Sequence, residues 1–408
     1  MPDRGLVFQV NIIDASLKQW RSDTPGCTKR NHLNNAGAAL MPAPVIRAVA
    51  AHLDLEAQIG GYEAADCRAA EIERGYDDIA KLVNAAPRNV AIVANATAGF
   101  VQAVSSFDFA PGEALITSRC DYTSNQIQYL ALQRRRGVSV LHAADLPEGG
   151  VDPDSVRDLL KRHRCRLVAM SWVPTNSGLV QDVESVGRVC SEFSVPYLID
   201  ACQAVGQMRI DVQQLNCDYL SVTARKFLRG PRGIGFLYAS DRALARGDYP
   251  LFVDMRGARW VNAQEFTIDP TARRFEDWEF PYALVLGLGE AVRYALEVGV
   301  DVALTRSWNM AAYARSRLQA IRGIRLFDRG RRQCAIVTAA VPGWTGGEIV
   351  EELATRGINT SASLREYGII DFDAKAVDSV VRISPHYYNT PAEIDQLAEA
   401  MTELSTQR

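Results

Sequence analysis

The stretch DYLSVTARKFLRGPRGIGFLY, residues 218–238, is the most informative part of this 408-residue sequence. It contains Lys226, one of six lysines, so 45 − 6 = 39 arginines supply the rest of the positive charge. A chain that prefers arginine this strongly is expected to keep lysine where a primary amine is needed. Neighbouring arginines lower a lysine pKa and favour the neutral amine that forms a Schiff base with a carbonyl. Lys226 is therefore the first candidate for a catalytic residue.

An acid follows an apolar run upstream of this lysine. In VPYLIDACQAVGQ, residues 195–207, the run ends at Asp200, and Gln203 comes three positions later. Ligands bind at the carboxyl ends of the strands in open α/β sheets, so an acid at such a strand end is well placed to meet one. A carboxylate in this position suits a partner with a protonated ring nitrogen. Asp200 is the second candidate for a catalytic residue.

These two segments carry a family resemblance. The order strand-Asp-x-x-Gln and then Thr-x-x-Lys-x-x-x-Gly-Pro-x-Gly resembles the fold-type-I pyridoxal-phosphate enzymes of the class V aminotransferase superfamily. That group includes cysteine desulfurases, kynureninase, isopenicillin-N epimerase-like proteins and C–S lyases. The resemblance covers residues 30–405 and implies pyridoxal 5'-phosphate as cofactor. It implies that Lys226 holds the cofactor as a Schiff base and that Asp200 keeps the ring protonated as an electron sink.

The sequence pattern predicts an α/β fold with two domains. Roughly seven strand-like runs occur between residues 89 and 240, and helix-period segments separate most of them, which predicts a mainly parallel sheet covered on both faces. The run after Lys226 follows too short a loop for a crossover and is expected to be antiparallel. A small α+β domain follows. We expect an N-terminal segment packing on the small domain, a large cofactor-binding domain and a small C-terminal domain, at residues 1–30, 31–275 and 276–408.

Composition excludes several function classes. A net charge of −3 and a pI near 6.0 leave no electrostatic footprint for nucleic acid. No signal-peptide pattern or membrane-length apolar run is evident, so we expect a cytoplasmic protein that does not bind membranes. Eight cysteines are scattered without CxxC pairs or histidines at ligand spacing, so neither a metal site nor a disulfide framework is expected.

The resemblance also implies a set of cofactor-binding residues. The segment VANATAGF, residues 93–100, leads from a strand into a helix start that suits a phosphate. A tyrosine replaces the stacking histidine of many relatives, and stacking needs only a π face. Either Thr175 or Asn176 is expected near the phenolic oxygen. The complete expected set is Ala96, Thr97, Tyr122, Thr175, Asn176, Asp200, Gln203, Thr223, Arg225 and Lys226.

The substrate side is expected to centre on Arg382 in VRISPHYYNT. The resemblance implies that this arginine forks onto the α-carboxylate of an amino acid, a geometry that lysine cannot reproduce. Asn35 and Ala36 are expected to line the pocket, with Tyr62 as a further wall. The resemblance also implies a homodimer with active sites at the subunit interface. In RRFEDWE, residues 273–279, Trp278 stands where relatives that reach the neighbouring phosphate carry small residues.

The expected reaction depends on a missing residue. Desulfurases of this superfamily place a persulfide-forming cysteine in the region that corresponds to RGINTSASLREYG, residues 356–368, which here holds serines but no cysteine. No residue is therefore expected to accept sulfur. We expect C–S cleavage by β-elimination on a cysteine S-conjugate, with an epimerase, an aminotransferase or a decarboxylating enzyme as alternatives. A catalytically silent binding relative is a further alternative, against which the intact Asp200, Lys226 and Arg382 argue.

Overall fold

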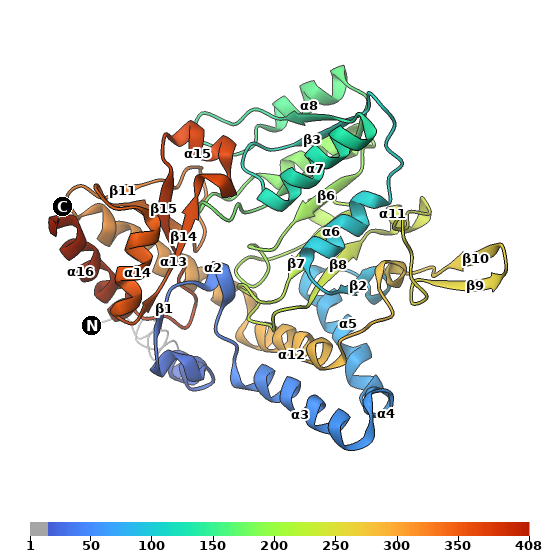
Figure 1. Ribbon diagram of the computed structural model, residues 1–408, viewed down its shortest axis with the longest axis horizontal. Coiled ribbons are helices and arrows are strands. Elements are labelled where there is room, and N and C mark those ends of the chain that lie inside the picture. Colours follow the sequence, from blue (N-terminus) through green and yellow to red (C-terminus); the bar gives the residue numbers. More distant parts are fainter. Residues whose placement is uncertain (1–14, 408) are drawn as a thin grey trace, which may run out of the picture.

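The structure, a computed structural model, describes residues 15–407 and is built around a seven-stranded sheet (Figure 1). The strand order is β2-β8-β7-β6-β5-β3-β4. Within this sheet of the described chain, β8 pairs antiparallel with both of its neighbours, and all other pairings are parallel. The predicted α/β class is therefore confirmed. The strands are β2 (Val90–Val93), β3 (Ala114–Thr117), β4 (Ser139–His142), β5 (Cys165–Ser171), β6 (Tyr197–Asp200), β7 (Tyr219–Thr223) and β8 (Gly235–Ala239).

Helices cover both faces of this sheet. Because side chains alternate along a strand, Leu198 of β6 joins one core while its neighbour Ile199 joins the other. The first core includes residues of α6 and α7, and the second includes residues of α5, α8, α9 and α12. This arrangement leaves the carboxyl ends of the parallel strands open. The helices are α5 (Ala69–Val83), α6 (Ala96–Ser105), α7 (Thr123–Arg136), α8 (Pro153–Arg162), α9 (Val183–Glu192), α10 (Val212–Leu215), α11 (Asp241–Ala245) and α12 (Tyr282–Val298).

The C-terminal third forms a second, four-stranded antiparallel sheet in the order β11-β12-β15-β14. Its last helix begins with the capping box that the sequence indicates, since Thr390 and Glu393 exchange hydrogen bonds. The elements are β11 (Arg325–Leu326), β12 (Val337–Ala340), β14 (Ser361–Leu364), β15 (Ser379–Ile383), α13 (Val300–Gln319), α14 (Gly346–Thr355), η4 (Arg365–Tyr367), α15 (Ile369–Lys375) and α16 (Pro391–Gln407).

The described part of the N-terminal segment contacts the C-terminal part of the chain. Arg21 donates hydrogen bonds to the Glu393 carboxylate and to the Tyr388 carbonyl, and Trp20 lies edge-on against Tyr387. Strand β1 (Asn31–His32) then pairs with β13 (Ile358–Asn359). The expected domain limits stay a prediction, and residues 1–14 lie outside the described residues. Past the expected boundary at residue 275, α12 still packs against α5 and α3 (Ala43–Ile59) of the large domain.

One segment, residues 35–59, is long and apolar enough to cross a membrane by length and composition alone. In the structure it is divided, because α2 (Asn35–Ala38) ends in an extended residue and α3 begins only at Ala43. The second part packs on α12 of the same chain. The packing of α3 on α12 is typical of a helix in a folded domain. That the protein does not bind membranes stays a prediction.

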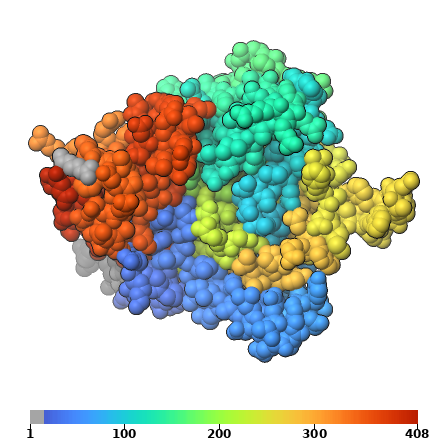
Figure 2. Space-filling view, in the orientation of Figure 1, coloured from blue at the N-terminus to red at the C-terminus, as the bar shows by residue number. Residues whose placement is uncertain are grey.

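A two-stranded hairpin of β9 (Ala258–Asn262) and β10 (Glu265–Ile268) stands out from the rest of the molecule (Figures 1 and 2). Trp260 on this hairpin is 78% exposed, and Phe266 and Trp278 are also exposed. Apolar side chains left in water in this way often mark a surface that another chain covers.

Candidate active site

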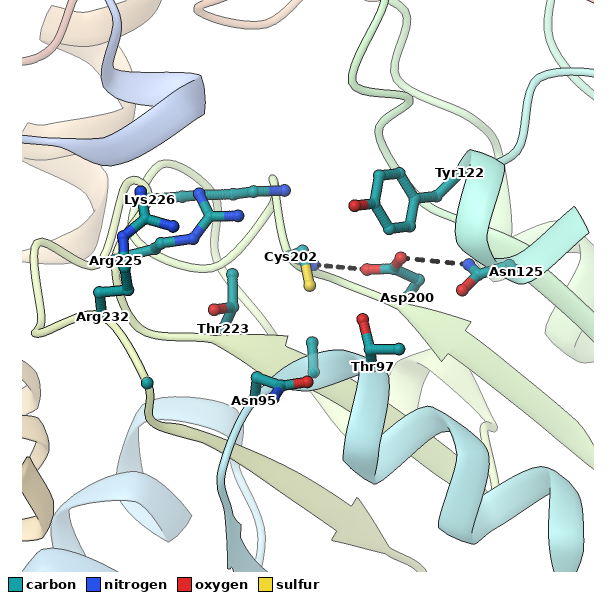
Figure 3. A pocket seen from close by; sticks show the side chains of 12 residues that line it. Asn95, Thr97, Tyr122, Asn125, Asp200, Cys202, Thr223, Arg225, Lys226 and Arg232 are labelled. Carbon is teal, nitrogen blue, oxygen red and sulfur yellow. Dashed lines mark hydrogen bonds between the residues drawn. The ribbon is translucent and has the colours of Figure 1, made fainter. Parts of the chain in front are cut away.

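A cavity of about 280 Å³ opens at the carboxyl ends of β6 and β7 (Figure 3). The β2–α6 turn, the start of α7, the end of β6 and the β7–β8 connection supply its walls. It brings together most of the residues that the sequence indicates for cofactor binding. The lining residues are Asn95, Ala96, Thr97, Tyr122, Asn125, Asp200, Cys202, Thr223, Arg225, Lys226, Arg232 and Gly233.

Lys226 extends into this cavity toward the ring of Tyr122 (Figure 3). Its Nζ lies 5.8 Å from the centre of that ring, and the residue is 7% exposed. Burial lowers the pKa of the Lys226 amine, and the charges of Arg225 and Arg382 lower it further, against the opposing effect of Asp200. The neutral amine is favoured, as predicted, but desolvation is a larger cause than the flanking arginines.

The loop that carries Lys226 is fixed by Arg229, which adopts a left-handed backbone conformation with φ of 62°. Its N–H donates to the Lys226 carbonyl, which closes the turn. Its buried guanidinium donates to the Leu40 carbonyl and lies over the ring of Tyr388. Contacts with Leu40 near the N-terminus and with Tyr388 in the C-terminal part of the chain therefore hold the backbone of Lys226 in place.

Asp200 lies at the end of β6 and faces the same cavity (Figure 3). Its Oδ1 accepts from the Cys202 N–H at 3.0 Å, and its Oδ2 accepts from Asn125 Nδ2 at 3.2 Å. Both carboxylate oxygens are thus oriented by donors behind them. These two donors fix the orientation of the carboxylate in the cavity wall.

The opposite end of the cavity is suited to a dianion. Asn95 caps α6 by accepting from the Ala98 N–H, which leaves the Ala96 and Thr97 N–H groups without partners in the described chain. Arg225 and Arg232 lie at the same side of the cavity as Thr223 (Figure 3). Burial lowers the pKa of Arg225, and the charge of Arg232 lowers it further. Arg225 is half-buried and donates to the Gly37 carbonyl, whereas Arg232 is exposed. Asp200 is the only acid among the lining residues, so both guanidiniums are available to an anionic ligand.

Arg232→Gln is expected to weaken binding of pyridoxal phosphate about tenfold or more and to leave binding of unphosphorylated pyridoxal unchanged, because a charge-assisted contact to phosphate is lost. Titration of the visible absorbance band with both compounds measures this ratio. Arg135→Gln on exposed α7 is the matched control. An equal loss for both compounds would show that Arg232 does not contact the phosphate.

Arg382 lies beside the cavity on β15 and is almost fully buried. Its Nη1 donates to Thr175 Oγ1 at 2.9 Å and its Nη2 to Asn34 Oδ1 at 3.1 Å, while Nε has no partner within the described chain. Burial lowers the pKa of Arg382 to about 10, and the charge of Arg225 adds to the shift. Because its Nε is unpartnered and no carboxylate contacts it in the described chain, this guanidinium can take up an anion, as the expected carboxylate-binding role requires.

Thr175 and Asn176 point in different directions. The Thr175 hydroxyl accepts from both Arg382 and Gln203, whose Nε2 also donates to the Ala36 carbonyl and whose Oε1 is buried without a partner in residues 15–407. Asn176 instead donates to the Tyr367 carbonyl at 2.7 Å. Of the two residues, Thr175 therefore joins the network around Gln203, and Asn176 holds the η4 segment.

The remaining expected substrate residues are placed differently. The Asn35 side chain donates to the Ser384 carbonyl and accepts from the Tyr388 hydroxyl, so it braces α2 against the end of β15. Ala36 offers its carbonyl to Gln203. Tyr62 is 67% exposed on α4 (Gly61–Cys67) and does not line the cavity of its own chain. The expected wall from Tyr62 is therefore absent within one chain.

Arg382→Ala is expected to raise the KM for an amino-acid substrate by at least about tenfold, because a charge-assisted bond to the carboxylate is lost. The visible spectrum of the bound cofactor should stay unchanged. Arg382→Lys should recover only part of the loss, since an ammonium cannot fork onto a carboxylate. Unaltered binding and turnover in Arg382→Ala would place the carboxylate site elsewhere.

Several lining residues were not predicted from the sequence: Asn95, Asn125, Cys202, Arg232 and Gly233. Two signals were present. Asn125 follows the expected stacking residue Tyr122 by one helical turn, and Arg232 lies inside the Gly-Pro-x-Gly spacing. Cys202 brings a thiol to the cavity, although the sequence predicts no residue that accepts sulfur. Burial raises the pKa of the Cys202 thiol, as does the charge of Asp200, so the thiolate is disfavoured there.

Known proteins are similar to this chain over most of its length. The aminotransferase class-V family model matches residues 31–397. A probable cysteine desulfurase from Methanothermobacter thermautotrophicus is 24% identical over 392 residues, covering 94% of this chain and 97% of the relative. A probable hercynylcysteine sulfoxide lyase from Mycobacterium tuberculosis is 26% identical over 399 residues, covering 95% of this chain and 93% of the relative.

Solved structures share the fold. A cysteine desulfurase from Thermococcus onnurineus has a TM-score of 0.87 at 20% identity, covering 96% of this chain and 98% of that chain. The cystine C–S lyase C-DES, solved in complex with its product cysteine persulfide, has a TM-score of 0.83 at 20% identity, covering 93% of this chain and 99% of that chain.

Proposed function

The chain belongs to the class V aminotransferase family and is a pyridoxal-phosphate-dependent enzyme, and we propose that it cleaves a C–S bond by β-elimination on a cysteine S-conjugate. One observation carries the proposal. Lys226 and Asp200 line one cavity and the charge of the buried Arg382 acts on the Lys226 amine, whereas residues 356–368 contain no cysteine to take up sulfur. A leaving group at Cβ can depart without a protein nucleophile once the α-proton has been removed.

The residues around the cavity fit the cofactor. Lys226 would supply the amine, Asp200 would pair with the ring nitrogen and Tyr122 would supply an aromatic face. Thr97, Arg225 and Arg232 would hold the phosphate. Gln203, which donates to Thr175 and Ala36, has a buried Oε1 without a partner in residues 15–407. When bound, the cofactor supplies an electron sink for the charge that develops at the substrate Cα.

The side chains of the protein then have separate tasks. Arg382 binds the substrate carboxylate, and the Thr175 hydroxyl and Asn34 hold the guanidinium in place. The Lys226 amine removes the α-proton, since burial favours its neutral form. The C–S bond breaks with its electron pair leaving on sulfur, which gives a thiol or a sulfenate. Hydrolysis of the remaining three-carbon fragment yields pyruvate and ammonia.

Cysteine desulfuration is a second candidate that one observation favours. Cys202 lines the cavity, and several relatives are described as probable cysteine desulfurases. Burial opposes this reading, because it raises the pKa of the Cys202 thiol and reduces the nucleophilic thiolate. The relative described as a probable hercynylcysteine sulfoxide lyase supports the elimination.

Incubation with S-alkyl cysteines and their sulfoxides tests the proposal. Pyruvate and ammonia should form in equal amounts, together with the sulfur product. A requirement for a 2-oxo acid would instead identify an aminotransferase. Exchange of the α-proton in D2O without bond cleavage would identify an epimerase, and release of CO2 a decarboxylating enzyme. Absence of every reaction in cofactor-loaded protein would identify a binding relative.

We also propose that the protein is a cytoplasmic homodimer. The exposed apolar side chains of the hairpin and its surroundings, Phe252, Met255, Trp260, Phe266 and Trp278, support a covering second copy. Light scattering after size-exclusion chromatography should give twice the chain mass of 44.9 kDa. A mass of one chain at micromolar concentration would contradict the dimer.

A further inference from the structure

A second buried carboxylate lies directly behind the active site. Asp121, in the loop between β3 and α7, is 5% exposed and does not line the cavity. Its Oδ1 accepts from the backbone N–H groups of Tyr122 and Ser171, at 2.7 and 3.1 Å, and from the Ser171 hydroxyl at 2.6 Å. Its Oδ2 accepts from the hydroxyls of Thr117 and Tyr129, at 2.8 and 3.0 Å.

Asn125 connects this carboxylate to the active site. Its Nδ2 donates to Asp121 Oδ1 and to Asp200 Oδ2, each at 3.2 Å. If the Asn125 amide were reversed, its oxygen would face two carboxylates and repel both. The Asp121 carboxylate therefore ensures that the Asn125 nitrogen, and not its oxygen, faces Asp200. Figure 3 shows Asp200 held between this amide and the Cys202 N–H.

The same Asp121 oxygen also fixes the position of Tyr122. The Tyr122 N–H donates to Oδ1, and the Tyr122 ring faces the Lys226 amine. One buried oxygen therefore sets two walls of the cofactor cavity, the aromatic face and the acid. Burial raises the pKa of Asp121, and the nearby Asp200 charge raises it further, although hydrogen bonds from Ser171 and Thr117 oppose the shift.

We infer that Asp121 is a positioning residue, which acts through the Asn125 amide to keep the Asp200 carboxylate aimed at the ring nitrogen of the cofactor. Two carboxylates that share one amide repel each other, and a protonated ring nitrogen against Asp200 offsets that repulsion. The inference depends on the cofactor and on Asp200. It does not depend on which group leaves the substrate, so it can be tested separately from the proposed reaction.

The contacts of Asp121 provide a substitution that alters charge and leaves shape intact. Both partners of Oδ2 are hydroxyls, which can turn from donating to accepting. In Asp121→Asn the amide nitrogen can therefore replace Oδ2, while the remaining oxygen keeps the contacts of Oδ1. Asn125→Ala removes the link itself. Tyr129→Phe is the control, because it removes one donor to Oδ2 and leaves both Oδ1 and Asn125 in place.

The experiment measures the protonation of the ring nitrogen in holoenzyme loaded with cofactor that is 15N-labelled at that position. Asp121→Asn and Asn125→Ala should each lower the proton affinity of the ring nitrogen about tenfold, since each weakens or removes a hydrogen bond to a charged group. The double variant should be no worse than the more severe single variant, because both act along one path. Tyr129→Phe should leave the 15N shift and its pH profile unchanged.

Three results would overturn the inference. Additive effects in the double variant would mean that Asp121 does not act through Asn125. An Asp121→Asn protein with an unchanged 15N pH profile would mean that the buried charge does not affect Asp200. If Tyr129→Phe changes the 15N pH profile as much as Asp121→Asn does, the effect comes from altered packing of the β3–α7 loop and not from the contact between Asp121 and Asn125. If Asn125→Ala fails to fold, the 15N pH profiles of Asp121→Asn and Tyr129→Phe still test the inference, since only the first should change.

Discussion

Lys226→Ala is expected to lower kcat by at least about 10³-fold, because the amine that removes the α-proton and the covalent anchor of the cofactor are lost together. The cofactor should still bind, since the helix N-terminus at Ala96 and Thr97 and the two arginines of the cavity are untouched. Its visible band should shift to that of the free aldehyde. Stopped-flow turnover and absorbance measurements on the same protein sample test both expectations.

Two controls make the result specific. Lys161→Ala on exposed α8 removes a lysine away from the cavity and should leave turnover and spectrum unchanged. Borohydride reduction of the unaltered protein should fix the cofactor on Lys226 only, as read by peptide mass spectrometry. Reduced cofactor on another lysine would refute the assignment.

Asp200→Ala is expected to lower kcat by about 10²–10³-fold, because a preorganised charge that stabilises the transition state is removed. The KM should change much less, since Arg382, the proposed carboxylate-binding residue, and its contact with Thr175 are unaltered. Asp200→Asn keeps the shape and removes the charge, so it should show most of the same loss. Steady-state kinetics of both variants measure the effect.

Asp158→Ala is the matched control for this pair, because Asp158 is an exposed acid on α8 outside the cavity. A loss of less than threefold in both Asp200 variants would contradict the role of the acid. Loss of the bound cofactor, with normal turnover restored by excess pyridoxal phosphate, would reduce Asp200 to a cofactor-binding residue.

The central strands follow directly from local sequence. Runs such as VAIV and YLID, which become β2 and β6, are short, apolar and bounded by turn residues, so the sheet and its antiparallel strand are predictable without a structure. Asp200 and Lys226 are predictable for the same reason, because each lies next to a strand end and the two stand in a known order.

The rest of the site depends on contacts between distant parts of the chain. Asn125 and Asp200 are separated by 75 residues, and no local pattern indicates that an amide joins them. The sequence does not distinguish Arg232 from the other arginines near it. Only the structure shows that its side chain lines the cavity. No motif in the sequence indicates that Cys202 lines the cavity, because its position there depends on the conformation of the turn after β6. Tyr62 is exposed and does not line the cavity of its own chain, so its expected role as a wall of the pocket stays a prediction.

The most direct test of the proposed reaction follows the fate of sulfur. Cofactor-loaded protein would be given cysteine or an S-alkyl cysteine sulfoxide, and pyruvate, alanine and the intact protein mass would be measured after single and multiple turnovers. The elimination predicts pyruvate from the sulfoxide with no added mass on the protein, and little reaction with cysteine. Alanine formed from cysteine in step with sulfur bound to the protein, both lost in Cys202→Ala, would contradict it.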